Sequence, residues 1–200
     1  MKCSIVDYGT GNLQSVQNAL EHLGHTVSRS NSDDLFTSTD VVIFPGQGSF
    51  GPAIQKLDQL NLKNKLIQYV ESKKPFIGIC LGYQLLFNGS EESSNSTGLG
   101  CFKGNFNRFK NSSLSVPHMG WNSISTTGEK SILNQFNNER FYFVHSYFLP
   151  STNEKSYAIT DYGVKFVSAI ANKTQLITQF HPEKSGDVGL ALLDSFLKGI

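Results

Sequence analysis

Cysteine, charge and long apolar runs are all scarce in this sequence. The three cysteines, Cys3, Cys80 and Cys101, are too few and too odd in number for a disulfide framework, so we expect reduced thiols. No apolar run approaches the ~18 residues that a membrane-spanning helix needs. Met1 leads straight into a strand-like segment, without the apolar core of a signal peptide. We therefore predict a soluble, cytoplasmic protein.

Charge of one sign is also missing. Charged residues make up 16% of the 200 residues, and 17 Lys and Arg against 16 Asp and Glu leave a formal net charge of +1. Nucleic acids and anionic membranes select basic surfaces, so we predict neither as a partner. What the chain does have is apolar material, 38% of its residues including 15 Phe and 7 Tyr, which is enough to build a core.

The first half of the chain alternates between two hydrophobic patterns. Short apolar runs predict strands at residues 3–6, 26–29, 41–44 and 76–79. Apolar residues at helical spacing predict helices within residues 13–23, within 50–73, where two fit, and within 81–87. Strands alternating with helices favour a mostly parallel central sheet with helices on both faces.

The second half is richer in strands. A polar loop is expected at residues 89–97, and a tight hairpin at Asp161–Gly163. Short strands are predicted at 105–110, 121–125, 141–145, 157–160, 164–171 and 175–179, followed by a helix at 189–197. No linker separates the halves, so we predict a single α/β domain over residues 1–200, with an antiparallel extension of its sheet.

Cys80 has the surroundings of a nucleophile. It lies in Gly78–Ile79–Cys80–Leu81–Gly82, after a predicted strand and before a predicted helix, which is nucleophile-elbow spacing with cysteine in place of serine. Small neighbours permit the sharp turn, the helix N-terminus favours a thiolate, and the Leu81 N–H is left to stabilise an oxyanion. The alternative is a small buried side chain on a core strand.

His181–Pro182–Glu183 offers a partner for this thiol. A thiol nucleophile needs a base, and the base benefits from a carboxylate that fixes its tautomer. On extended backbone, residues 181 and 183 point the same way, so we expect Glu183 to hold the His181 ring. Alone, this segment also fits a surface turn. Together with the cysteine elbow it predicts a Cys-His-Glu triad.

Two glycine-containing loops follow other strands. Pro45–Gly46–Gln47–Gly48 should lie at the carboxyl edge of the sheet, where α/β sites form, and its glycines would let the Gln47 peptide turn toward the nucleophile; a simple turn is the alternative. Tyr8–Asn12 lacks the third glycine of a dinucleotide loop and predicts a turn or a partner-facing loop. No metal-ligand spacing with Cys3 or Cys101 is found for His22, His25, His118 and His145, so we predict no metal site.

Three of these segments, P-G-x-G, G-I-C-L-G-Y-Q and H-P-E in this order, resemble the triad-type (class I) glutamine amidotransferases. Residues 7–13, 117–122, 142–147 and 179–186 are similar, more narrowly, to the glutaminase subunits of imidazole glycerol phosphate synthases. The resemblance runs from about residue 3 to residue 198. It implies a flavodoxin-like amidotransferase fold, and it departs from the family at Gln47, where Val is common, and at Tyr83, where Met is frequent.

Site residues are implied by this resemblance position by position. Cys80 would attack the glutamine carboxamide and form a γ-glutamyl thioester, His181 would act as general base and then as acid, and Glu183 would orient it. The oxyanion would be held by backbone N–H groups of Gln47 and Leu81. Glutamine would bind at Gly48, Gln84, His145, Ser146 and Tyr147. The partner would contact Asn12, Met119, Trp121, Tyr142 and Lys184.

The activity implied is glutamine hydrolysis without a cofactor, as part of histidine biosynthesis. The ammonia would pass to a cyclase subunit with a (β/α)8 barrel, which forms imidazole glycerol phosphate and aminoimidazole carboxamide ribotide. Such a barrel needs roughly 250 residues, so the partner must be another polypeptide, in a heterodimer. The alternatives are a related amidotransferase that serves another substrate, such as a surface-sugar precursor, a stand-alone γ-glutamyl thiol hydrolase, and a binding module with an inactive triad.

Overall fold

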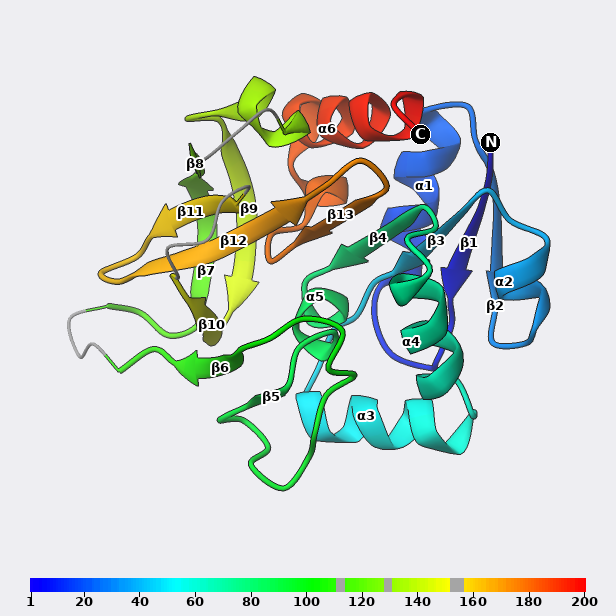
Figure 1. Cartoon of the computed structure of the whole chain (residues 1–200). Coiled ribbons are helices and arrows are strands. Elements are labelled where there is room, and N and C mark those ends of the chain that lie inside the picture. Colours follow the sequence, from blue (N-terminus) through cyan, green and yellow to red (C-terminus); the bar gives the residue numbers. More distant parts are fainter. Residues whose placement is uncertain (111–113, 128–130, 152–156) are drawn as a thin grey trace.

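A twisted β-sheet runs through the molecule and carries helices on both faces (Figure 1). The computed structural model describes residues 1–110, 114–127, 131–151 and 157–200. The strands are β1 (Lys2–Val6), β2 (Thr26–Ser30), β3 (Val41–Phe44), β4 (Phe76–Ile79), β5 (Gly89–Ser90), β6 (Asn105–Arg108), β7 (His118–Ser123), β8 (Ser125–Thr127), β9 (Arg140–His145), β10 (Tyr147–Pro150), β11 (Tyr157–Asp161), β12 (Lys165–Ala171) and β13 (Gln175–Thr178). The helices are α1 (Leu13–His22), α2 (Asp34–Thr37), α3 (Phe50–Gln59), α4 (Lys63–Glu71), α5 (Leu81–Leu85) and α6 (Gly186–Lys198), with 3-10 turns η1 (Ile132–Phe136) and η2 (Pro182–Lys184).

The sheet has a parallel half and a mostly antiparallel half. Its order is β2-β1-β3-β4-β13-β12-β10-β6-β5, and the strands from β2 to β13 all run parallel. From β13 onward the pairs β13–β12, β12–β10 and β10–β6 are antiparallel. Strands β7 and β9 form a separate antiparallel ribbon. The order of the parallel half is that of flavodoxin-like folds, which confirms the predicted fold class.

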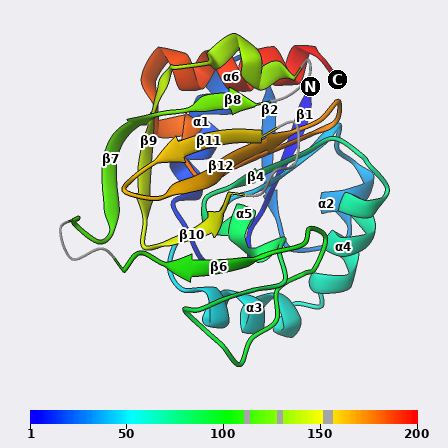
Figure 2. The ribbon, with the colours of Figure 1, turned by 60° about the vertical axis from the view of Figure 1, so that its left-hand side comes forward.

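Alternate residues of the parallel strands enter two different cores. In β3, Val41 and Ile43 pack with α1 and α6, whereas Val42 and Phe44 pack with α3 and α4. This period of two is the geometry of a strand buried on both faces. Figure 2 shows the same division, with α6 above the sheet and α3 below it. The described helices include none that is long and apolar enough to cross a membrane.

Several predicted boundaries need correction. The predicted loop 89–97 contains the short strand β5, which pairs with β6, and β10 was not predicted at all. Both strands owe their form to pairing with residues far along the chain, not to a local apolar pattern. Helix α5 ends at Leu85, two residues before the predicted end, and β7 begins at His118 rather than at residue 121.

Parallel pairing decides where the candidate site lies. Strands β3, β4 and β13 are neighbours in the sheet, so their carboxyl ends meet at one edge. The segments that follow them are Pro45–Gly48, Cys80 and Gln179–Glu183. All three predicted catalytic segments therefore leave the sheet at the same edge.

Candidate active site

Cys80 occupies a strained turn between β4 and α5. Its backbone is in the left-handed region, with φ 55° and ψ −108°, which is unusual for a residue with a side chain. The turn depends on close packing at Gly82, where an added Cβ would lie 1.8 Å from the Phe44 carbonyl oxygen. Only glycine fits there. The strain at Cys80 is held in place by the contact between α5 and the end of β3.

His181 and Glu183 form a buried pair beside this turn. The Nδ1 atom of His181 lies 2.7 Å from Oε1 of Glu183, and each side chain is 2% exposed. The backbone is extended only at His181; Pro182 begins the turn η2, so the predicted extended conformation is wrong beyond His181. Within this turn the Glu183 carboxylate still lies on the same side as the His181 ring, as the 2.7 Å contact requires.

Ser185 fixes this pair to β9, a role that the sequence reasoning missed. Its hydroxyl donates to the His181 carbonyl at 2.6 Å and accepts from the Tyr142 N–H at 3.0 Å. The His181 N–H in turn donates to the Tyr142 carbonyl at 2.9 Å. Strand β9 and the His181 segment are thus joined by two hydrogen bonds, and the third holds Ser185 to His181 within the segment. A serine four residues after the histidine is too common a spacing to signal this from sequence.

Electrostatics favour a protonated His181. Burial on its own would lower the pKa of the ring, but the Cys80 thiolate and the Glu183 carboxylate together raise it to about 10. The ring Nε2 is buried and has no hydrogen-bond partner among the described residues, and the same is true of Glu183 Oε2. The arrangement therefore suits a thiolate and an imidazolium that face each other across the site.

The sulfur has two further polar neighbours. Its thiol lies 3.9 Å from the Val144 carbonyl oxygen, and the Gln179 Nε2 lies 3.9 Å from the sulfur. The amide of Gln179, which is fully buried, is oriented by Gln84, whose Nε2 donates to Gln179 Oε1 at 3.0 Å. Gln179 was not predicted as a site residue. The available signal was its place two residues before the candidate base, at the end of an apolar strand.

A cavity of about 430 Å³ opens over the sulfur. It brings together every predicted residue of the triad except Glu183, both predicted oxyanion residues and all five predicted glutamine-binding residues. Its lining is Gln47, Gly48, Cys80, Leu81, Gln84, Glu92, Pro117, Tyr142, Val144, His145, Ser146, Tyr147, His181 and Lys184. Glu92 was missed, and the signal for it was an acidic pair inside the polar loop. A free amino acid is small enough for such a volume.

The two glycines around Gln47 have different freedom. A Cβ on Gly46 would lie 2.2 Å from the Tyr8 hydroxyl oxygen, and that hydroxyl donates to the Pro45 carbonyl at 3.1 Å. Gly48 has φ +96° and would have no neighbour within 4 Å of an added Cβ. The expectation of freedom on both sides of Gln47 is therefore wrong for Gly46. The segment is clamped at its start and free at Gly48, and Tyr8 is a buried clamp rather than part of a partner-facing loop.

The predicted partner-facing residues lie in three places. Tyr142 and Lys184 line the cavity itself. Met119 and Trp121, 62% and 47% exposed, are large apolar side chains on β7, and the Trp121 ring contacts Tyr142 with centroids 6.3 Å apart. Asn12 is exposed and caps α1, its side chain accepting from the Ser15 N–H at 3.4 Å.

No group of three or more metal-ligating side chains comes together in the described part of the chain.

Comparison with known proteins assigns this arrangement to a family. The family model "Glutamine amidotransferase class-I" matches residues 4–199. The chain belongs to this family. This amidotransferase is 43% identical over 201 residues to the imidazole glycerol phosphate synthase subunit HisH of Methanopyrus kandleri, covering 100% of this chain and 98% of that protein. The narrower resemblance to these subunits is therefore confirmed.

One further relative of the amidotransferase is a longer protein, and one solved structure shares its fold. The chloroplastic imidazole glycerol phosphate synthase hisHF of Arabidopsis thaliana is 42% identical over 198 residues, which cover 97% of this chain and only 33% of that protein. The present chain thus spans about a third of that fused relative. A crystal structure of a glutamine amidotransferase has a TM-score of 0.76, 16% identity and 99% coverage of both chains, which shows the fold alone.

Proposed function

We propose that this amidotransferase hydrolyses glutamine to glutamate and ammonia and transfers the ammonia to a cyclase in histidine biosynthesis. The observation that carries the proposal is the cavity that joins Cys80 and His181, with His181 held 2.7 Å from Glu183. The similarity to HisH subunits over nearly the full length of both chains supports the same activity. Residues 1–200 would act as a single domain in this role.

The reaction begins with the proton already on His181. The Cys80 thiolate attacks the carboxamide carbon of glutamine, and negative charge develops on the amide oxygen. That charge faces the N–H of Leu81, which is the first residue of α5 and so has no intrahelical acceptor. A second N–H from the Gln47–Gly48 segment completes the oxyanion site. Collapse of the intermediate breaks the C–N bond, and the leaving nitrogen takes the His181 proton to depart as ammonia.

Hydrolysis of the thioester reverses the direction of proton transfer. His181 is now neutral and removes a proton from water, which attacks the thioester carbon. The C–S bond breaks, glutamate leaves, and the thiolate and imidazolium are restored. Glu183 stays hydrogen-bonded to Nδ1 throughout, so the proton is always handled at Nε2. Its pairing with the imidazolium explains why both carboxylate and ring can be buried.

The rest of the cavity suits the backbone end of glutamine. Glu92 adds a carboxylate to the lining, and its Oε2 accepts from the Phe50 N–H at 2.9 Å, which fixes the carboxylate in place. A fixed carboxylate complements the α-ammonium group of an amino acid. The backbone of residues 145–147 and the amide of Gln84 line the same cavity and would complete the recognition of glutamine.

The partner that we propose is a cyclase subunit with a (β/α)8 barrel, in a heterodimer. The Arabidopsis and Schizosaccharomyces pombe relatives are longer proteins named imidazole glycerol phosphate synthase hisHF. This supports a cyclase as the partner of the present chain. The exposed pair Met119 and Trp121 supplies the apolar anchors typical of a protein interface. Because Tyr142 and Lys184 line the cavity, docking there would close it over the released ammonia. Asn12 would extend the contact toward α1.

The test is to purify this chain with the cyclase from the same organism and to measure glutamate release with and without the cyclase and its ligand. We expect a stable one-to-one complex and a glutaminase rate that rises when the ligand is added. Full activity of the isolated chain, with no complex, would instead identify a stand-alone γ-glutamyl hydrolase. A complex with a different acceptor enzyme would redirect the pathway.

A further inference from the structure

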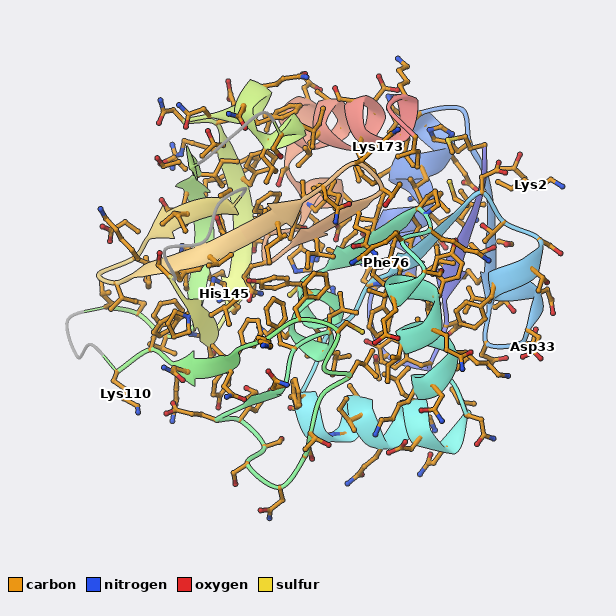
Figure 3. All side chains as sticks on the ribbon, in the orientation of Figure 1. Lys2, Asp33, Phe76, Lys110, His145 and Lys173 are labelled. Carbon is orange, nitrogen blue, oxygen red and sulfur yellow. The ribbon has the colours of Figure 1, made fainter. Side chains whose placement is uncertain are left out.

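Two buried histidines lie next to the glutamine cavity but are not needed for its chemistry. His118 is the first residue of β7 and His145 is the last of β9, and the two are paired in the β7–β9 ribbon. They are 2% and 5% exposed. Figure 3 shows His145 in the interior of the strand-rich half, among closely packed side chains. His145 lines the cavity, whereas His118 lies behind it.

The hydrogen bonds around these rings leave one arrangement of protons. His145 Nδ1 lies 2.7 Å from the Tyr147 carbonyl oxygen. A carbonyl only accepts, so this nitrogen carries a proton and donates. In the neutral ring, Nε2 is then an acceptor, and it lies 3.0 Å from His118 Nδ1. His118 must therefore donate from Nδ1, which makes its own Nε2 an acceptor.

The chain of donors ends at a side-chain amide. Asn122 Nδ2 lies 3.3 Å from His118 Nε2, and the same Nδ2 donates to the Asp161 carbonyl at 2.9 Å. An amide nitrogen has two protons, one for each acceptor. Every donor in the path from Asn122 through His118 and His145 to Tyr147 thus points the same way.

Aromatic rings keep both histidines neutral. The His118 ring is stacked between Phe143, with centroids 4.9 Å apart, and Tyr162, at 4.0 Å. His145 lies against the rings of Phe109 and Phe166. Burial lowers the pKa of His118 to about 4 and that of His145 to about 3. A neutral ring is the form that the one-way chain of donors requires.

The last hydrogen bond of this series, from His145 to the Tyr147 carbonyl, lies at the turn that lines the cavity. Between β9 and β10 only Ser146 is outside a strand, and its carbonyl accepts from the Phe109 N–H at 3.1 Å. The next carbonyl, that of Tyr147, is held by His145. Because a peptide group is planar, holding the two carbonyls also fixes the N–H groups on the opposite edges of the same peptides. The Phe109 N–H holds the Ser146–Tyr147 peptide, and the orientation of the next peptide, Tyr147–Phe148, depends on the tautomer of His145.

We propose that His118 is a positioning residue for glutamine. By donating to His145 Nε2, it holds His145 in the Nδ1–H tautomer, and His145 in turn holds the backbone turn 145–147 against the substrate. This inference rests on the proposed function, since it concerns the same cavity. His118 does not itself line the cavity. Its proposed contribution is to the affinity for glutamine and not to proton transfer.

The test compares three variants in the complex with the cyclase. His118→Phe keeps a flat ring in the aromatic stack and removes the donor, so KM for glutamine should rise about tenfold, as expected for one lost buried hydrogen bond, with kcat changed less than KM. His118→Asn places an amide nitrogen near the position of Nδ1 and should restore most of the affinity. Tyr162→Phe is the matched control, because it loses the bond from the Tyr162 hydroxyl to the Ser115 carbonyl at 2.9 Å in the same stack.

Each outcome bears on a different statement. An unchanged KM in His118→Phe, or an equal rise in Tyr162→Phe, would overturn the positioning role. If His118→Phe does not fold, ¹⁵N spectra of the histidine rings in the wild-type protein decide instead: both rings should be neutral with the proton on Nδ1, and a proton on Nε2 of His145 would overturn the proposal. A wild-type complex without any glutaminase activity would refute the proposed function itself.

Discussion

The molecule contains two buried histidine sites that hold protons in opposite ways. His181 is 2% exposed, and so is His118, yet the pKa of His181 is raised to about 10 and that of His118 is lowered to about 4. The difference lies in the neighbours. His181 faces a thiolate and a carboxylate, whereas among the described residues His118 meets aromatic rings and neutral hydrogen-bond partners. Burial by itself lowers the pKa of a histidine, and only adjacent negative charge, as at His181, outweighs that effect.

The same comparison separates chemistry from shape. A ring that is protonated at neutral pH and faces a sulfur can give its proton to a leaving group. A ring that is neutral at every physiological pH can only hold its neighbours in place. Variants that remove the nucleophile or the base should therefore have larger effects than variants that change only how neighbouring groups are positioned.

Cys80→Ala should have the largest effect. Among the described residues that line the cavity, Cys80 alone carries a thiol, so glutamine hydrolysis should fall by about 10⁶-fold, the scale seen when a triad nucleophile is removed. Cyclisation with added ammonium salts should survive in the complex, because the ammonia is then supplied directly. The measurement is glutamate release beside ammonium-dependent product formation; a residual glutaminase near the wild-type rate would remove Cys80 from the mechanism.

His181→Ala and Glu183→Gln test the role of the charged pair that distinguishes the His181 site from the His118 site. Removing the ring should approach the defect of Cys80→Ala. Replacing Glu183 by Gln keeps a hydrogen bond but removes the charge that helps to raise the pKa of His181, so it should be milder by about 10²-fold. In Glu183→Gln, the step in the pH profile of kcat that reports the titration of His181 should shift. In His181→Ala this step should disappear. Equal defects would mean that the carboxylate does more than orient and stabilise the ring.

Gly48→Val tests whether the Cys-His-Glu triad is sufficient for the full glutaminase rate without a second oxyanion donor. Gly48 has φ +96°, a conformation that β-branched residues resist, and a changed backbone at this position would disturb the adjacent Gln47, whose N–H is the proposed second oxyanion donor. We expect the ligand-stimulated rate to fall by about 10²–10³-fold, the value of one oxyanion donor, with complex formation unchanged. Undiminished stimulation in the variant would place the regulation outside this loop.

The pH dependence of stability should show both histidine sites at once. The lowered pKa values of His118 and His145, about 4 and about 3, mean that the unfolded chain binds more protons below pH ~6.5. Their contribution is present above that pH and is lost as the pH falls toward 4 and 3. His181 has a raised pKa, so its contribution is present below pH ~6.5 and is lost as the pH rises toward 10.

Calorimetry across pH 4 to 10 measures these two limbs. In His118→Phe the acid limb should become shallower while the alkaline limb is unchanged. In His181→Ala the reverse should hold. A pH dependence that is the same in both variants would show that other groups dominate the titration of the folded state.

Local patterns predicted those parts of the fold that are set by local residues. Strands β3 and β4 have their predicted bounds, because each is a four-residue apolar run with a proline directly beside it. Pro45 follows β3, and Pro75 precedes β4. Strands β5 and β10 could not be found in this way, since each forms only when a distant strand offers its edge.

The same limit applies to the site. Cys80, His181 and Gly48 stand in recognisable segments, and the cavity contains all three. Gln179 contacts Cys80 and Ser185 contacts Tyr142, and both of these partners are far away in the sequence. The pairing of His118 with His145 depends on the register of two strands. No spacing in the sequence signals that register, so the contact between His118 and His145 cannot be predicted from it, although the resemblance implies a glutamine-binding role for His145.

The position of β13 has a consequence for the synthesis of the protein. Strand β13 fills the gap between β4 and β12, and only after it is in place can His181 reach Cys80. A chain that emerges N-terminus first therefore has its nucleophile long before its base. Until residues beyond 175 are available, β4 also presents an unpaired apolar edge, which is a site for aggregation. A truncated chain that ends before β13 also lacks His181 and Glu183, so the triad cannot form in it.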